Sequence, residues 1–263
     1  MSRPKIGLAL GSGGARGFSH LGVIKVLEQH QIPIDYIAGS SMGALVGAFY
    51  GAGQSVDQMY QLALTFKRKY FMDIMVPKMG LIQGERIKSY IKMFTYNKRL
   101  EEFKTPVSIV ATDIYSGEKV IFNEGDAASA VRASISIPGV FVPEKINDRL
   151  LVDGGVIDRI PVSVVKDMGA DIVIAVDCSK FEQNTEVYSI YDIIMQSIDI
   201  MQNEITNYRM VDADIVMRPE VYSYSSRNYS QIKEIIEKGE EEAEKHIQSI
   251  KKAIEDWKGL NAN

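Results

Sequence analysis

Short apolar runs alternate with longer amphipathic segments along most of the chain. The runs are rich in β-branched residues and are continuous, which is typical of strands covered on both faces. They fall at residues 5–10, 34–38, 107–112, 150–152, 172–176 and 215–217. Segments with helical spacing of apolar residues lie between most of them, at residues 17–30, 43–53, 56–69, 85–94, 190–210 and 231–257. This order predicts a three-layer α/β/α fold with a central, mostly parallel sheet.

The middle of the chain departs from this alternation. The stretches "GEKVIFNEG" and "GVFVPEKINDRLLVDGG", at residues 117–125 and 139–155, have the glycine and Asn-Asp punctuation of β-hairpins or a meander, so we expect a mixed sheet. The length of 263 residues suits a single domain. We expect residues 1–263 to form it, with the chemical motifs in about 5–161 and a helical part at about 185–257.

A glycine-rich loop follows the first predicted strand. In "LGSGGARG", Gly11, Gly13 and Gly14 let backbone N–H groups converge on an anion, as phosphate loops and oxyanion holes both require. Arg16 either holds a phosphate-like group there or makes a structural ion pair. Asp35, 24 residues beyond Gly11, keeps dinucleotide binding as an alternative, although the loop departs from the G-x-G-x-x-G pattern.

The second predicted strand runs into "GSSMG", which fits the nucleophile elbow G-x-S-x-G. In that motif a tight turn between a strand and a helix, here flanked by Gly39 and Gly43, exposes the central serine. Ser41 is therefore the candidate nucleophile. The N–H of Met42 and the start of the following helix would face a developing anion.

A hydrolytic serine needs a base, and the chain offers no convincing histidine. His246 lies on the charged terminal helix, and His20 and His30 lie in or at the end of a helix, where packing or surface roles are usual. Three carboxylates stand at the ends of predicted strands: Asp113, Asp153 and Asp177. Asp153 is favoured because Gly154 and Gly155 allow a sharp turn that brings its carboxylate to a serine hydroxyl. A Ser–Asp dyad is the resulting hypothesis.

Composition narrows the functional classes. A net charge of −4 and a pI near 5.5 give no general attraction for nucleic acid. The single cysteine, Cys178, excludes an internal disulfide and is expected to be a buried thiol, and the three histidines have no zinc-like spacing. We therefore expect no metal and no cofactor. No apolar run approaches 18 residues, which predicts a cytoplasmic chain.

Three motifs, "GSGGARG", "GSSMG" and "DGG", stand in an order that resembles the patatin-like phospholipase family, notably bacterial members related to the catalytic domain of neuropathy target esterase. The resemblance extends from about residue 5 to 161, and "ATDIYSGE" and "ASISIPGVF" add to it. It implies that Ser41 is the nucleophile, Asp153 its partner and the Gly13–Gly14 backbone an oxyanion hole. Arg16 matches the basic residue that closes that loop, whereas Ser12 replaces the first glycine of the family's triplet.

The expected function is a serine lipid acyl hydrolase that forms an acyl-serine and acts on lysophospholipids or other single-chain lipid esters. Two alternatives stay open: a dinucleotide- or phosphate-binding oxidoreductase, and a non-catalytic lipid-binding module. Residues 66–84, rich in aromatics and methionine, form either a lid or interfacial segment, giving peripheral membrane contact, or a helix and loop packed on the core.

Overall fold

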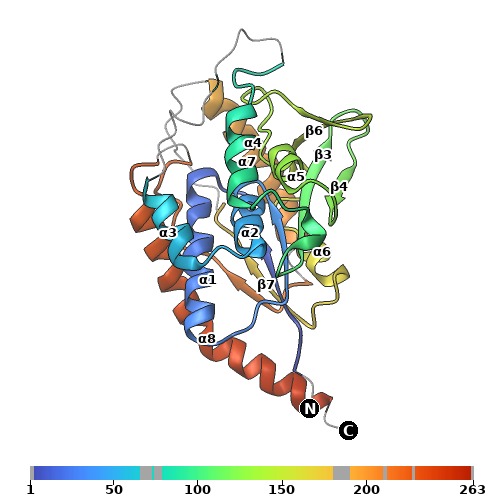
Figure 1. Cartoon of the computed structure of the whole chain (residues 1–263). Helices are drawn as coiled ribbons and strands as arrows, with labels where there is room; N and C mark the ends of the chain where they lie inside the picture. Colours follow the sequence, from blue (N-terminus) through green and yellow to red (C-terminus); the bar gives the residue numbers. More distant parts are fainter. Residues whose placement is uncertain are drawn as a thin grey trace.

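A mixed β-sheet forms the centre of the molecule (Figure 1). The computed structural model describes residues 3–65, 73, 79–179, 190–209, 212–226 and 229–261, so most of the segment at 66–84 lies outside the described residues. Within these ranges eight strands form one sheet in the order β5-β6-β3-β2-β1-β7-β8, with β4 also paired to β3. The fold class expected from the sequence is confirmed.

Five strands on one side of the sheet are parallel, and three on the other side are antiparallel to their neighbours. The parallel strands are β1 (Ile6–Leu10), β2 (Tyr36–Ser40), β3 (Val107–Asp113), β7 (Ile172–Val176) and β8 (Ile215–Met217). The antiparallel strands are β4 (Lys119–Phe122), β5 (Glu144–Ile146) and β6 (Arg149–Asp153). The carboxyl ends of β1 and β2 therefore lie at one edge, where ligands bind in such sheets.

Most helices cover one face of the sheet, and their apolar side chains merge with those of the strands in one large core. They are α1 (Ser19–Gln29), α2 (Met42–Ala52), α3 (Val56–Thr65), α4 (Glu85–Phe94), α5 (Ala127–Ser134) and α8 (Ile232–Leu260). On the opposite face lies α6 (Val162–Asp167), and α7 (Ile190–Arg209) packs against the short helix η4 (Gly154–Val156). The described part of the chain also contains the 3-10 turns η1 (Gly14–Phe18) and η3 (Leu100–Glu102).

The alternation of side chains along β1 explains the two layers. Ile6, Leu8 and Leu10 point into the large core, whereas Ala9 belongs to the small core under α6. A Cβ at Gly7 would lie 2.1 Å from Val165 Cγ1, so this face of the strand is small enough for α6 to pack closely.

The predicted central strands and long helices are confirmed within a few residues. Two differences matter for the site. Strand β2 continues to Ser40, because Gly39 still pairs with Leu10 of β1. Helix α5 was not expected from the sequence, since "DAASAVRASIS" contains few large apolar residues to set a helical period.

Candidate active site

Ser41 lies in the turn between β2 and α2 with a backbone that non-glycine residues rarely adopt. Its φ of 55° and ψ of −120° cost roughly 1–3 kcal/mol and persist only where neighbours hold them. The Ser41 N–H donates to Ser134 Oγ at 2.9 Å, and the Ser134 hydroxyl donates to Val110 O at 2.6 Å. The Leu45 N–H donates to Ser41 O at 3.1 Å. Strand β3, α5 and α2 thus jointly fix the serine.

Asp153, the last residue of β6, lies beside this serine. The Ser41 hydroxyl donates to Asp153 Oδ2 at 2.6 Å, and the Gly155 N–H donates to Asp153 Oδ1 at 2.7 Å. The Asp153 N–H donates to Ser136 O at 2.9 Å, which fixes the backbone of the aspartate. The structure therefore brings together the serine and the aspartate selected from the sequence, and both are buried.

Burial sets the electrostatics of this pair. Loss of solvent raises the pKa of Asp153 from 3.8 to about 6, and the hydrogen bonds from Ser41 and Gly155 and the charge of Arg159 oppose the rise only in part. A carboxylate with this pKa is a stronger proton acceptor than an exposed aspartate and is still ionised at neutral pH. The arrangement can accept the proton of a serine hydroxyl.

Four glycines allow the close approaches that this geometry needs. A Cβ at Gly39 would lie 2.5 Å from Ala44 N, and one at Gly43 would lie 2.1 Å from Leu10 O. A Cβ at Gly154 would lie 2.2 Å from Val110 O. A Cβ at Gly155 would lie 3.0 Å from Asp153 Oδ1 and 2.5 Å from Ser12 Oγ. The chain therefore needs glycine on both sides of the elbow and in the turn after the aspartate.

The glycine loop lies at the same pocket. Gly13, Gly14, Ser41 and Asp153 all line a small pocket of about 30 Å³. The Gly11 N–H donates to Val176 O at 3.1 Å, so it has no proton to offer a ligand and Gly11 serves the turn. The N–H groups of Gly13, Gly14 and Met42, in contrast, donate no hydrogen bond to any residue that the structure describes. Gly13 and Gly14 line the small pocket, and Met42 directly follows Ser41, so these three N–H groups are the candidate anion donors.

Arg16 closes the loop from one side and is buried. Its Nε donates to Tyr224 O at 2.7 Å, which ties η1 to the segment before α8. This contact favours the structural interpretation of Arg16, although the residue also lines the small pocket.

The three histidines stand apart from the serine and the aspartate. Fully buried His20 has Nε2 2.7 Å from Gly11 O, and burial lowers its pKa to about 4, so it supports the glycine loop as a neutral ring. His30 contacts Glu244, and His246 contacts Glu242 on α8.

Cys178 and Ser19 lie beside His20. The thiol is buried, with Sγ 3.0 Å from Ser19 Oγ and 3.5 Å from His20 Nδ1. Burial raises the pKa of Cys178 to about 12, so the thiol is not a nucleophile at neutral pH. The Ser19 hydroxyl donates to Arg16 O at 2.8 Å. These side chains therefore pack against the glycine loop and the turn that follows it.

The position of Asp35 argues against the alternative that the glycine loop binds a dinucleotide. Its carboxylate accepts hydrogen bonds from the Ile6 N–H and from Arg3, at the start of β1. The glycine loop follows the other end of that strand, so Asp35 cannot reach a ribose bound at the loop.

A larger, apolar cavity of about 130 Å³ adjoins Ser41. Its walls come from η1, α1, α2, α3 and α4 and from the segments after α5 and before α8. Ile137 lines both this cavity and the small polar pocket. The site thus has a polar compartment lined by the glycine loop and an apolar compartment, with Ser41 lining both.

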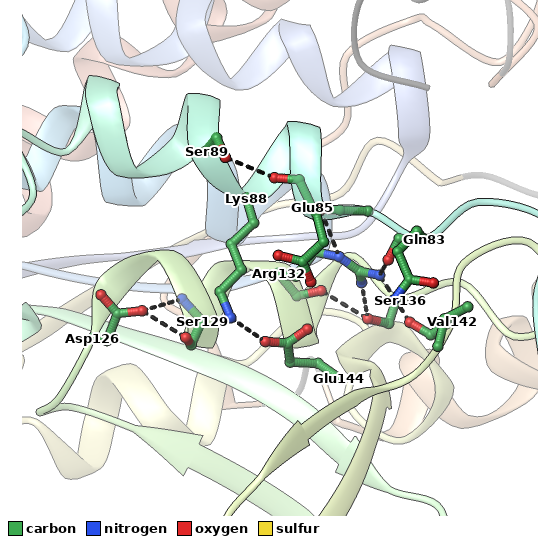
Figure 2. A network of polar contacts seen from close by, with 11 residues as sticks. Gln83, Glu85, Lys88, Ser89, Asp126, Ser129, Arg132, Ser136, Val142 and Glu144 are labelled. Carbon is green, nitrogen blue, oxygen red and sulfur yellow. Dashed lines mark hydrogen bonds and ion pairs between the residues drawn. The ribbon is translucent and has the colours of Figure 1, made fainter. Parts of the chain in front are cut away.

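Arg132, on α5, is a further buried residue that the sequence did not single out (Figure 2). Its guanidinium is buried and donates to the carbonyl oxygens of Gln83, Gly84 and Val142 and to the hydroxyl of Ser136. These groups come from three separate chain segments. Nothing local to "AVRAS" signals this role, because three of the four partners are backbone carbonyls outside α5 and two of them lie 48 and 49 residues away.

Among the described residues no three or more His, Cys, Asp or Glu side chains form a group suited to a metal ion. No helix in the same part of the chain combines the length and apolarity needed to cross a bilayer.

Comparison with solved structures places the fold in a known class. VipD from Legionella pneumophila superimposes with a TM-score of 0.66 at 13% identity, covering 95% of this chain and 67% of that one. The type III effector protein ExoU superimposes with a TM-score of 0.56 at 14% identity, covering 94% and 53%. Residues 8–166 match the family model for patatin-like phospholipase. The chain belongs to the patatin-like phospholipase family.

Sequence relatives agree with this assignment. An uncharacterized NTE family protein of Mycobacterium bovis is 38% identical over 184 residues, which are 69% of this chain and 51% of that protein. Lysophospholipase NTE1 of Yarrowia lipolytica is 34% identical over 191 residues, which are 70% of this chain and 13% of that protein. The match thus spans about half of the mycobacterial relative and a small part of the yeast one.

Proposed function

We propose that the chain is a serine lipid acyl hydrolase in which Ser41 attacks an ester carbonyl and Asp153 takes the proton of its hydroxyl. The observation that carries this proposal is the 2.6 Å hydrogen bond from Ser41 Oγ to a carboxylate of raised pKa. The N–H groups of Gly13 and Gly14 at the small pocket, and that of Met42 directly after Ser41, support it, because the tetrahedral intermediate needs donors for its oxyanion.

The reaction has two halves. Ser41 Oγ bonds to the ester carbonyl carbon while Asp153 accepts the hydroxyl proton, and the N–H groups of Gly13, Gly14 and Met42 stabilise the oxyanion. The intermediate collapses to an acyl-serine, and Asp153 returns the proton to the leaving alcohol. Asp153 then deprotonates a water molecule that attacks the acyl-serine. When the second intermediate collapses, the bond from the acyl carbon to Ser41 Oγ breaks and Asp153 returns the proton to Ser41 Oγ. The products are the alcohol, released in the first half, and a fatty acid, so no cofactor or metal takes part.

The proposed substrates are lysophospholipids and other single-chain lipid esters. The apolar cavity beside Ser41 is suited to an acyl chain and supports this class. The name of the yeast relative, a lysophospholipase, points the same way. Such substrates lie at lipid surfaces, and we therefore include peripheral contact of a cytoplasmic protein with a membrane in the proposal.

The pH dependence follows from the pKa of Asp153. A general base works only when deprotonated, so kcat/KM is expected to be constant above pH 7 and to fall about tenfold per pH unit below a pKa near 6. Hydrolysis of p-nitrophenyl butyrate, followed at the pH-independent isosbestic wavelength of the product, measures this limb. A limb centred near pH 4 would contradict the proposed environment of the base.

A fluorophosphonate probe tests the function itself. We expect one covalent adduct, mapped by mass spectrometry to the peptide that contains Ser41, and turnover of lysophospholipid in mixed micelles by unlabelled protein. Preincubation with a competing ester should slow labelling. Lipid binding without an adduct and without turnover would instead support the non-catalytic lipid-binding module.

A further inference from the structure

The apolar cavity follows one face of α2 away from the serine. Four residues of α2 line it: Met42, Leu45, Val46 and Phe49. Their spacing of three, one and three residues puts their side chains on one face of the helix. Ser41, directly before this helix, also lines the cavity. Along α2 the cavity therefore extends from Ser41 to Phe49, and we call this part of it the channel.

Helix α4 forms a second wall with the same spacing. Ile87, Tyr90, Ile91 and Phe94 line the channel. The Phe94 and Phe49 rings lie 5.6 Å apart between centroids at an angle of 50°, so the last turns of the two helices meet there. The Gln54 amide, just beyond α2, donates to Phe94 O at 2.9 Å and fixes that meeting point.

Among the α2 and α4 residues that line the cavity, Phe49 and Phe94 are the last along their helices. Phe49 follows Ser41 by eight residues, about 12 Å along a helix that rises about 1.5 Å per residue. Side chains on a helix lean toward its N-terminus, which brings the ring closer to Ser41 by about one residue. An extended acyl chain lengthens by about 1.2 Å per bond. The same value follows from an extended polypeptide, in which the three backbone bonds of a residue span about 3.6 Å.

We propose that Phe49 and Phe94 close the far end of this channel and set the preferred acyl chain at about eight to ten carbons. The proposal rests on the proposed function for the position of the ester carbonyl at Ser41. It assigns substrate selection to two aromatic side chains that have no part in the chemistry.

Chain-length profiles test this assignment. The p-nitrophenyl esters from butyrate to palmitate are hydrolysed by the wild-type protein, Phe49→Ala and Phe94→Ala, and each profile is normalised to its own butyrate rate. We expect a wild-type optimum at about C8 to C10. Each alanine variant should move it up by about two to four carbons, because the cavity that a truncated ring leaves collapses only in part.

Phe103→Ala is the matched control. Phe103 is a buried phenylalanine of the same core, beside Gly51, and does not line the channel. Its truncation should lower thermal stability as the other two do and leave the chain-length optimum in place. Val46→Phe, halfway along the channel, should move the optimum down to about C6 or shorter.

Three outcomes separate the two proposals. Unchanged profiles in both Phe49→Ala and Phe94→Ala, or a wild-type optimum of C14 or longer, overturn the assignment of the aromatic pair. No hydrolysis and no fluorophosphonate adduct overturn the proposed function. In that case thermal shifts with free fatty acids of C6 to C16 measure the channel directly, with the largest wild-type shift expected at C8 to C10 and a longer optimum in the two variants.

Discussion

Replacing Ser41 with alanine is expected to lower kcat for ester hydrolysis by about 10⁴- to 10⁶-fold, because loss of a nucleophile in a unit of cooperating residues removes the covalent route altogether. The variant should also lose the fluorophosphonate adduct. Steady-state rates on p-nitrophenyl butyrate and intact-protein mass spectrometry measure the two effects.

Ser40→Ala controls for this substitution. Ser40 is the neighbouring buried serine, and its hydroxyl accepts a hydrogen bond from Ser12 Oγ at 3.2 Å. Its loss removes a buried polar contact without touching the nucleophile, so turnover should stay within a few-fold of wild type. Retention of more than about 1% of turnover in Ser41→Ala would show that another residue is the nucleophile.

The second large effect is expected for Asp153→Asn, which should lower kcat/KM by about 10³- to 10⁴-fold. Asparagine keeps the shape and can still accept the hydrogen bond from the Gly155 N–H. It cannot take a proton from Ser41, and its amide would donate to the hydroxyl oxygen that must attack. The pH-dependent limb near pH 6 should disappear from the residual activity.

The same substitution should stabilise the fold, which distinguishes loss of a base from loss of structure. The folded-state pKa of Asp153 is about 6 against 3.8 for an unperturbed aspartate, so the folded state disfavours the ionised form. Ionisation of Asp153 therefore lowers the free energy of unfolding as pH rises from about 4 to 6. Above pH 6 the loss amounts to about 3 kcal/mol. Asp153→Asn should therefore raise Tm at pH 8 and barely change it at pH 4. Equal Tm differences at the two pH values would contradict the buried, ionised carboxylate.

Much of this site could be proposed from local sequence. Strand, tight turn and helix around Ser41 are encoded within a dozen residues, and the glycines beside Ser41 and Asp153 mark turns where side chains do not fit. The contact between the serine and the aspartate is a different matter, since 112 residues separate them. The sequence suggested the pair by elimination, and the assignment of its roles stays a prediction.

Other features depended on tertiary packing and left no local signal. Ser134 is one of many serines in the chain, and its contact with the Ser41 N–H exists only because α5 packs beside β3. The channel residues on α2 and α4 form ordinary amphipathic or apolar faces, which predict burial but not a cavity between them. Whether such faces form a filled core or a channel depends on the distance between α2 and α4, which the sequence does not encode locally.

The buried guanidinium of Arg132 joins the two parts of the site. Through Gln83 and Gly84 it holds the start of α4, a wall of the proposed acyl channel, and through α5 it is continuous with Ser134, whose hydroxyl accepts a hydrogen bond from the Ser41 N–H. An acyl chain too long for the channel would push α4 outward, and this displacement would reach the elbow through one rigid connection. Overlong substrates would then be penalised in kcat as well as in KM, so the channel would select its substrates by alignment in addition to affinity.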